Sequence, residues 1–250
     1  MNKDNIEIYD DENFFNNYIE LRNSKNNYND LIEQPIVFDL IGDVTEKTVL
    51  DIGCGYGAMS IKIANNGAKE VLAIDVSKKM IEKGKLENPH KKITYKNLSA
   101  QKINTIEGSF DIIVSCLAIH YIEDFQKLFF DIACLLKKDG KFIFSMEHPM
   151  YTASKFSQQW IKNNDGNNNI IGFVTDHYGE EGVRNIEWLG KSVTKYHHKV
   201  ETVINALIDA GLTLEKVIEP APTKEMIQKV EKTARELHRP AYLIVKCRKT

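Results

Sequence analysis

The sequence lacks the features that mark membrane-spanning and secreted, disulfide-rich proteins. Its most apolar stretch, residues 112–122, is interrupted by Ser115 and His120 and is shorter than the roughly 18 residues that cross a bilayer. The first 12 residues are polar and acidic, without the basic and apolar segments of a secretory signal. The four cysteines include no C-x-x-C pair, so neither a disulfide framework nor a zinc site is indicated. We therefore expect a cytoplasmic protein with reduced, mostly buried thiols and no membrane partner.

An excess of charge of either sign is also missing. The chain has 33 Lys and Arg against 35 Asp and Glu, which gives a formal net charge of -2. Such a chain has no overall field that would attract phosphate backbones, so we expect no nucleic-acid partner. Its 250 residues are 42% hydrophobic, which is enough to bury the core of one large domain. The oligomeric state does not follow from these numbers.

Short β-branched runs alternate with longer amphipathic runs from residue 48 onward, which is typical of repeated βα units and a parallel sheet. The apolar spacing predicts helices over 58–65 and 125–138. The pattern predicts seven strands, at residues 48–52, 70–75, 93–97, 110–116, 141–146, 212–218 and 241–247.

The second half of the sequence is organised differently. Residues 150–190 contain spaced aromatics and an Asn-rich patch but no sustained period, so we interpret them as an insertion after the fifth strand. Residues 192–210 are predicted to form one helix, stopped by Gly211, and residues 222–238 another. We expect a single domain over 1–250, divided into an N-terminal helical cover (1–47), a ligand-binding core (48–149), the insertion (150–190) and a part that completes the sheet (191–250).

The most informative segment is the run Asp51-Ile52-Gly53-Cys54-Gly55-Tyr56-Gly57, which follows a buried strand and precedes a helix. Glycines at such a turn let the backbone approach a ligand closely. About 20 residues later the second strand ends in Asp75, where a carboxylate can accept hydrogen bonds from a ribose diol. Gly53, Gly55 and Ala58 also satisfy the dinucleotide pattern G-x-G-x-x-G/A, so the glycines alone do not identify the ligand. Asp51 discriminates, because its carboxylate would repel a pyrophosphate but attract an ammonium or sulfonium group.

In these residues the chain resembles the class I S-adenosylmethionine-dependent methyltransferases, whose first motif D-x-G-x-G-x-G is met by Asp51, Gly53, Gly55 and Gly57. The resemblance continues to about His148 through the segments at 109–115 and 135–141. It implies an α/β fold, with a doubly wound, mostly parallel seven-stranded sheet, helices on both faces and an antiparallel last strand. It also implies S-adenosylmethionine as the methyl donor and S-adenosylhomocysteine as the product.

The resemblance further implies which residues hold the donor. Gly53 and Gly55 would hold its methionine part, Asp51 its amino group and Asp75 its ribose hydroxyls. The adenine would lie near six further residues: Val76, Ser99, Ala100, Gln101, Cys116 and Leu117. Many relatives have an acid after the third strand that contacts the adenine amino group, whereas this chain offers only Ser99 and Gln101 there, so that contact departs from the family pattern.

A general base for methyl transfer has three candidates. His148 follows the fifth strand at the rim where substrates dock and is our first choice. His120 follows the fourth strand, although a histidine beside apolar residues is as often a packing residue. Tyr178 in the insertion is the third. His197 and His198 cannot both face one site on a helix, so we expect no metal site.

The acceptor is expected to be a small molecule. The N/D-P-P-Y/F motif of enzymes that methylate base amines is replaced here by residues 115–118, and Cys116 lacks the preceding proline of the cytosine-C5 enzymes. Methyl transfer would be an in-line displacement for which alignment and exclusion of water suffice. Residues expected to contact the acceptor come from the N-terminal cover and the insertion: Tyr18, Arg22, Trp160, Arg184 and Trp188. Two alternatives remain: a protein that binds the adenosyl ligand without catalysis, and an NAD(P)-dependent oxidoreductase.

Overall fold

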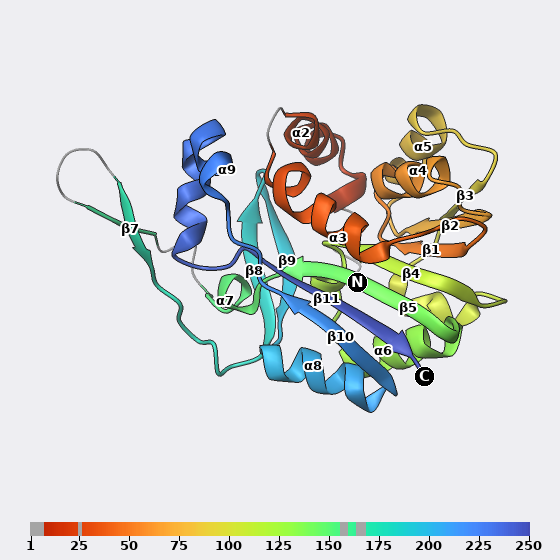
Figure 1. Ribbon diagram of the computed structural model, residues 1–250. Helices are drawn as coiled ribbons and strands as arrows, with labels where there is room; N and C mark the ends of the chain where they lie inside the picture. The colour runs from red at the N-terminus through yellow and green to blue at the C-terminus, as the bar shows by residue number, and fades with distance from the viewer. Residues whose placement is uncertain (1–7, 25–26, 156–159, 164–168) are drawn as a thin grey trace.

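The computed structural model describes residues 8–24, 27–155, 160–163 and 169–250. Seven strands form its central sheet: β1 (Thr48–Ile52), β2 (Glu70–Asp75), β3 (Ile93–Asn97), β4 (Phe110–Cys116), β5 (Leu136–Glu147), β10 (Leu212–Ile218) and β11 (Tyr242–Lys249). Their order across the sheet is β10-β11-β5-β4-β1-β2-β3 (Figure 1). β1 to β5 pair in parallel, whereas β11 is antiparallel to both β5 and β10. The predicted doubly wound sheet with an antiparallel last strand is confirmed.

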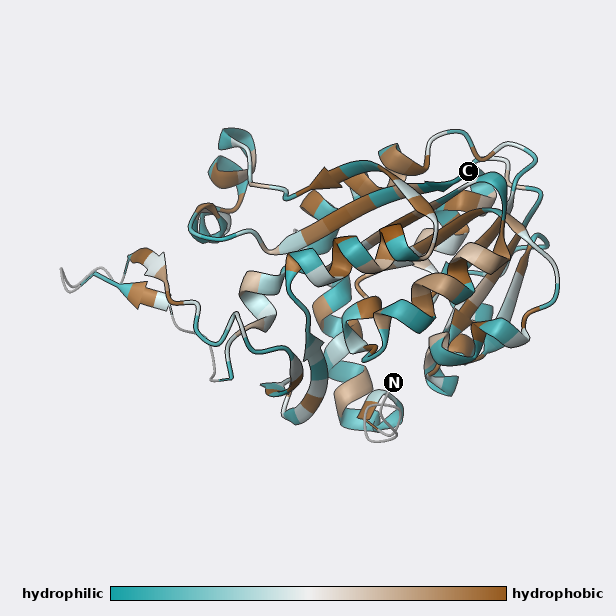
Figure 2. Cartoon of the chain, turned by 90° about the horizontal axis from the view of Figure 1, so that it is seen from below, coloured by the Kyte–Doolittle hydropathy of each residue, from teal (hydrophilic) through white to brown (hydrophobic). Residues whose placement is uncertain are grey.

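Helices cover both faces of this sheet (Figure 1). One face carries α3 (Gln34–Ile41), α4 (Ala58–Asn65) and α5 (Lys78–Glu87), and the other carries α6 (Phe125–Leu135) and α8 (Val200–Asp209). The strands between them are largely apolar, as Figure 2 shows. β1 is buried along its whole length, which explains why its sequence is mostly apolar; its acid, Asp51, is the residue before the last one, Ile52.

Strands β1 to β4 have the predicted bounds, but β5 begins earlier than predicted. The helix expected over 125–138 ends at Leu135, and the chain continues directly into β5. Phe110 of β4 pairs with Leu136, and the Lys137 ammonium donates to Asp111 Oδ2 over 2.8 Å. These two contacts hold the residues after Leu135 along β4, so they extend as a strand instead of continuing the helix.

The helix predicted over 192–210 is wrong in its first half. Residues Lys191–His197 form β9, which pairs with β8 (Gly182–Trp188) in an antiparallel hairpin, and only α8 is helical. Leu189 and Gly190 connect the two strands with φ of 52° and 81°, the left-handed geometry of a two-residue hairpin turn. Lys195, which the helix would have placed on a solvated face, is 3% exposed.

The helix predicted over 222–238 is divided into two pieces. α9 (Lys224–Lys229) is followed by the 3₁₀-helix η4 (Glu231–Leu237). Val230 separates them because its φ of -143° and ψ of 84° are not helical. The strand predicted at 241–247 is present as β11.

The insertion contains α7 (Pro149–Thr152) and a small hairpin of β6 (Trp160–Lys162) and β7 (Ile170–Phe173), which extends away from the main sheet (Figures 1 and 2). Most of the Asn-rich patch lies outside the described residues. Before β1 the chain forms α2 (Glu12–Asn23) and the π-helical turn η1 (Asn29–Glu33). Short 3₁₀ turns η2 (Ala100–Thr105) and η3 (Ile119–Tyr121) follow β3 and β4.

Within the described ranges, the structure has no helix long and apolar enough to cross a membrane. All four cysteines are free thiols. Cys247 is buried, but Cys54 and Cys116 are half-buried and Cys134 is exposed on α6, so the prediction of mostly buried thiols holds fully for Cys247 alone.

Candidate functional site

A deep pocket opens at the carboxyl ends of β1, β2 and β4, beneath the N-terminal segment, and it encloses about 1050 Å³ including solvent at its mouth. Three groups of residues line it. The turn after β1 and the start of α4 contribute Asp51, Gly53, Cys54, Gly55, Tyr56, Ala58 and Met59. The segments after β2, β3 and β4 contribute Asp75, Val76, Met80, Leu98, Ser99, Ala100, Cys116, Leu117, Ala118, Tyr121 and Ile122. The N-terminal segment contributes Tyr9, Tyr18, Arg22, Asn29, Glu33 and Gln34.

The glycine turn after β1 forms the floor of the pocket. Gly53, Gly55 and Gly57 have φ of 72°, 54° and 89°, which side chains with a Cβ rarely adopt. A Cβ on Gly53 would lie 2.3 Å from Ala118 Cβ, and one on Gly57 would lie 2.1 Å from Tyr95 Oη. A Cβ on Gly55 would meet no described atom within 4 Å, because this residue faces the open pocket. Gly57 itself lies outside the lining, so its role in the turn is packing against Tyr95.

Asp51, the residue before the last one of β1, is a buried carboxyl group at the base of the pocket. Its side chain is 1% exposed, and Ser60 Oγ donates a hydrogen bond to its Oδ2 over 2.5 Å. Burial raises the pKa of Asp51 to about 7, although the Ser60 hydrogen bond opposes the shift. A positively charged ligand group would reverse this effect by stabilising the carboxylate.

Asp75 ends β2 and faces the same turn. Its Oδ2 accepts from the Gly55 backbone N–H over 2.9 Å, and its Oδ1 accepts from the Ser77 N–H over 2.8 Å. Burial raises the pKa of Asp75, and these backbone donors partly oppose the shift. Each carboxylate oxygen keeps a further lone pair with which it can accept a ligand hydroxyl.

The segments after β2, β3 and β4 form an apolar slot beyond Asp75. Five of the residues predicted for the adenine line it: Val76, Ser99, Ala100, Cys116 and Leu117. Gln101 does not line the pocket; its backbone N–H donates to Ser99 Oγ, which caps η2.

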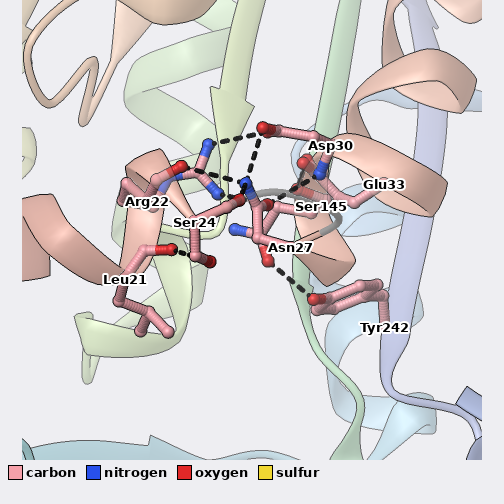
Figure 3. Close-up of polar contacts among 9 residues, drawn as sticks. Leu21, Arg22, Ser24, Asn27, Asp30, Glu33, Ser145 and Tyr242 are labelled. Atoms are coloured by element: carbon pink, nitrogen blue, oxygen red, sulfur yellow. Dashed lines mark hydrogen bonds and ion pairs between the residues drawn. The ribbon is translucent and has the colours of Figure 1, made fainter. Parts of the chain in front are cut away.

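The N-terminal segment closes the pocket from above, and it carries Tyr18 and Arg22 as predicted. Arg22 is fixed at the junction of α2 and η1, where its guanidinium donates to Asn27 Oδ1 over 3.3 Å and to Asp30 Oδ1 over 3.2 Å (Figure 3). Sequence reasoning missed Glu33, which is 1% exposed and accepts from Ser145 Oγ. Burial raises the pKa of Glu33 despite the Ser145 hydrogen bond. Its position depends on contacts across the fold, which no local pattern reveals.

The three predicted base candidates lie outside this lining. His148 caps α7: its Nδ1 accepts from the Met150 N–H, so Nε2 carries the proton and donates to Glu219 Oε1 over 2.7 Å. Tyr178 packs on His197 and its Oη accepts from the Val200 N–H. His120 is buried next to the pocket residue Tyr121, with ring centroids 4.3 Å apart. Burial lowers the pKa of His120 to about 4, so it is neutral.

The predicted acceptor residues of the insertion are not gathered at the pocket. Arg184 is buried and its guanidinium donates to backbone carbonyls, including Ala153 O over 2.8 Å, which is a structural arrangement. Trp160 packs on Phe173 and Arg239. Trp188 contacts Phe14 and Tyr18 of the N-terminal segment and so lies nearest to the pocket.

In the described part of the chain, no group of three His, Cys, Asp or Glu side chains is placed to hold a metal ion. His197 and His198 diverge at the end of β9. The first contacts Thr152 Oγ1 and the Tyr178 carbonyl, and the second stacks on Phe125.

Comparison with known proteins identifies a matching family and similar proteins. Residues 50–144 match a family described as "Methyltransferase domain". A Haemophilus influenzae protein of uncharacterised function is 34% identical over 98% of this chain and 97% of its own length.

Two solved structures are similar over most of both chains. A protein from Mesorhizobium loti described as an S-adenosylmethionine-dependent methyltransferase is 35% identical, with a TM-score of 0.80 over 87% of this chain and 97% of that one. A Listeria monocytogenes structure described under the same activity is 33% identical, with a TM-score of 0.80 over 87% of this chain and 96% of that one.

Proposed function

Because this chain belongs to the S-adenosylmethionine-dependent methyltransferases, we propose that it transfers the donor's methyl group to a small-molecule acceptor. The observation that carries the proposal is the pocket at the glycine turn, which Asp51, Gly55 and Asp75 line together. The family assignment replaces the alternative of an NAD(P)-dependent oxidoreductase.

The pocket fits the donor in shape and charge. Gly55 leaves open space where a Cβ would otherwise stand, and this space suits the methionine part of the ligand. Asp75 suits a ribose diol, and the apolar slot at Val76, Leu98 and Leu117 suits an adenine. Asp51 and Glu33 supply carboxyl groups for a cation, and Arg22 supplies a guanidinium for a carboxylate. When bound, the donor would supply an electrophilic methyl group on a sulfonium.

Arg22 and Tyr18 were assigned to the acceptor from the sequence, but both share the pocket with Asp51 and Asp75. We therefore propose that Arg22 binds the carboxylate of the donor and that Tyr18 is a wall of the same pocket. The protein's own contribution to the reaction is alignment of the two reactants and exclusion of water by the N-terminal cover.

The cover has two parts in our proposal. The N-terminal segment lies over the donor, because Tyr9, Tyr18 and Arg22 line the pocket. The β8–β9 hairpin lies beside it, because Trp188 packs edge-on against Phe14 and Tyr18 at centroid distances of 5.5 and 6.0 Å. No described residue of 150–190 lines the donor pocket, so the insertion would act on the acceptor side.

An assay for release of S-adenosylhomocysteine tests the proposal. The purified protein, incubated with S-adenosylmethionine and a panel of small aromatic and aliphatic amines, alcohols, thiols and acids, should release the product with at least one acceptor. A protein that binds the donor but releases no product with any acceptor would be the non-catalytic binder instead. Asp75→Ala serves as the control, since it should lose the signal together with donor affinity.

A further inference from the structure

A buried ion pair lies beside the donor pocket, and neither partner was singled out from the sequence as part of a site. Lys195 of β9 is 3% exposed, and its ammonium donates to Glu147 Oε1 at the end of β5 over 2.6 Å. Burial alone would lower the pKa of Lys195, but the attraction of Glu147 outweighs it and the net shift is upward. In Glu147, burial would raise the pKa, and Lys195 reverses that shift, so the carboxylate is ionised.

The second oxygen of this carboxylate has no hydrogen-bond donor. Glu147 Oε2 is buried, and none of the described residues donates to it. A buried charged oxygen without a donor costs free energy, so such groups in native proteins call for an explanation. Lys195 therefore fixes one oxygen of this carboxylate, and the other oxygen has lone pairs that no described residue engages.

His120 faces the same oxygen without satisfying it. Its Nδ1 accepts from the Glu147 backbone N–H over 3.4 Å, which assigns the proton of the neutral ring to Nε2. Nε2 lies 4.0 Å from Glu147 Oε2, too far for a hydrogen bond. His120 therefore has no free lone pair with which to act as a base, whereas Glu147 Oε2 has.

Aromatic rings surround the pair. The Lys195 ammonium lies 5.4 Å from the ring centroid of Trp188 and 5.9 Å from those of Tyr121 and Tyr151. Tyr121 also lines the donor pocket, so its ring borders both the pocket and the ion pair. The pair is neutral overall and His120 is neutral. Arg239 lies 4.4 Å from the ring centroid of Tyr151 but is paired with Glu236 over 3.1 Å, so the charges around the site balance and favour a neutral ligand.

We propose that Glu147 and the rings of Tyr121, Tyr151 and Trp188 form the acceptor site, and that the acceptor is a neutral aromatic molecule whose nucleophile bears a proton. An arylamine and a phenol share this chemistry: a flat ring for the aromatic walls and one N–H or O–H donor for Glu147 Oε2. This inference rests on the proposed methyltransferase function and adds the class of substrate.

The proton balance of the transfer follows from this arrangement. The nitrogen or oxygen of the acceptor gains the methyl group with its own lone pair, and the sulfur keeps the electron pair of the bond that breaks. The nucleophile becomes more acidic as the new bond forms, and its proton passes to Glu147 Oε2. Lys195 is a positioning residue, which holds the carboxylate in place through Oε1.

Fluorine NMR of small probes tests this without requiring the natural acceptor. The protein is saturated with S-adenosylhomocysteine, and 4-fluoroaniline, 4-fluorophenol and 4-fluoroanisole are titrated separately. The first two should bind with dissociation constants of about 1 mM, while the anisole, which has no proton to donate, should bind at least about tenfold more weakly. The aniline and phenol arms identify which of the two nucleophiles the site prefers.

Two variants locate the binding. In Glu147→Gln the amide oxygen would still accept from Lys195, and the amide NH₂ would stand where Oε2 was. The N–H of the aniline or the O–H of the phenol would then face another hydrogen-bond donor, so both probes should bind about tenfold or more weakly. Glu219→Gln is the matched control, because Glu219 bonds His148 outside this cluster, and it should change nothing. If Glu147→Gln unfolds because Lys195 loses its counter-ion, the double variant Glu147→Gln/Lys195→Met removes the unpaired charge and takes its place.

The outcomes separate the two proposals. If S-adenosylhomocysteine itself does not bind, the proposed function fails. If it binds but no probe does, if the anisole binds as well as the phenol, or if Glu147→Gln leaves probe binding unchanged, the acceptor site is not at Glu147 and its free oxygen is merely hydrated.

Discussion

The carboxylate of Asp75, at the end of β2, accepts a hydrogen bond from the backbone N–H of Gly55 over 2.9 Å. This bond joins the ends of two neighbouring strands and fixes the glycine turn against the second of them. The same carboxylate is therefore a support of the turn and, in our proposal, a contact of the donor. Its replacement should affect both functions, and controls can separate them.

Asp75→Ala should weaken binding of S-adenosylhomocysteine by about 2 to 3 kcal/mol, or roughly 30- to 150-fold in the dissociation constant. The reason is the loss of a charged acceptor for the ribose hydroxyls, together with a looser turn at Gly55. Calorimetric titration of the folded variant measures the change. An unchanged dissociation constant would remove Asp75 from the site.

Asp111→Asn is the control for this experiment, because Asp111 also bonds a neighbouring strand but lies away from the pocket. It accepts from the Thr48 N–H and from Lys137, each over 2.8 Å. Burial would raise the pKa of Asp111, but these donors outweigh it and lower the pKa to about 2. The variant should melt at a lower temperature and bind the ligand as the unchanged protein does.

Two glycine substitutions should separate ligand binding from packing. In Gly55→Ala the new methyl group enters the open pocket, so binding should weaken at least about tenfold while backbone strain costs only about 1 kcal/mol of stability. In Gly57→Ala the methyl group would lie 2.1 Å from Tyr95 Oη, so the main loss should be in stability. Thermal melting and titration of both variants measure the two effects. Equal affinity losses in stably folded variants would contradict this assignment.

Binding of S-adenosylhomocysteine should strengthen as the pH rises toward 7. The ligand-free protein keeps a proton on Asp51 up to about pH 7, and only the ionised carboxylate can pair with the ligand's ammonium group. Binding must therefore release this proton below that pH, so affinity should rise by up to about tenfold per pH unit and then level off. Titrations in two buffers of different ionisation enthalpy measure the released proton.

The Ser60 hydroxyl provides a second test of the same group. Its hydrogen bond lowers the pKa of Asp51, so Ser60→Ala should move the levelling-off to higher pH, and Asp51→Asn should abolish the slope. A slope that survives in Asp51→Asn would assign the titration to another group.

Hydrogen exchange should reveal whether the N-terminal segment is a cover. Tyr9, Tyr18 and Arg22 line the pocket, so S-adenosylhomocysteine should slow exchange across 8–24 more than in β1 and β4 beneath it. Exchange in the β8–β9 hairpin should also slow on binding, because Trp188 packs on Phe14. Strong protection in the ligand-free protein that does not change on binding would make the segment fixed structure.

The parallel core could be predicted from sequence because its signals are local. β1 lies between β2 and β4 and is buried throughout, so most of its residues are apolar and its one charged side chain, Asp51, lines the pocket. The turn that follows needs left-handed backbone at three positions, and the sequence marks these with glycine. The sequence of this one strand and its turn therefore predicts both the fold class and the position of the pocket.

The β8–β9 hairpin, on which the proposed acceptor site depends, could not be predicted in this way. Lys191, Lys195 and Lys199 recur at helical spacing, and Val193, Val200 and Val203 do the same, so the segment imitates an amphipathic helix. The turn that makes it a hairpin contains Leu189 rather than the asparagine or aspartate that usually marks such a turn. Lys195 meets Glu147 across distant parts of the sequence, and their contact exists only in the folded chain.

Calorimetric titration of the purified protein with S-adenosylhomocysteine and, separately, with NAD and NADP tests the central claim most directly. The pocket has a carboxyl group at the end of β1 where a pyrophosphate would have to approach, and it offers Asp51, Asp75 and Arg22 to an ammonium, a ribose and a carboxylate. We predict a dissociation constant in the micromolar range, about 1 to 100 μM, for S-adenosylhomocysteine and no measurable binding of either dinucleotide. Tighter binding of NAD or NADP than of S-adenosylhomocysteine would contradict the account.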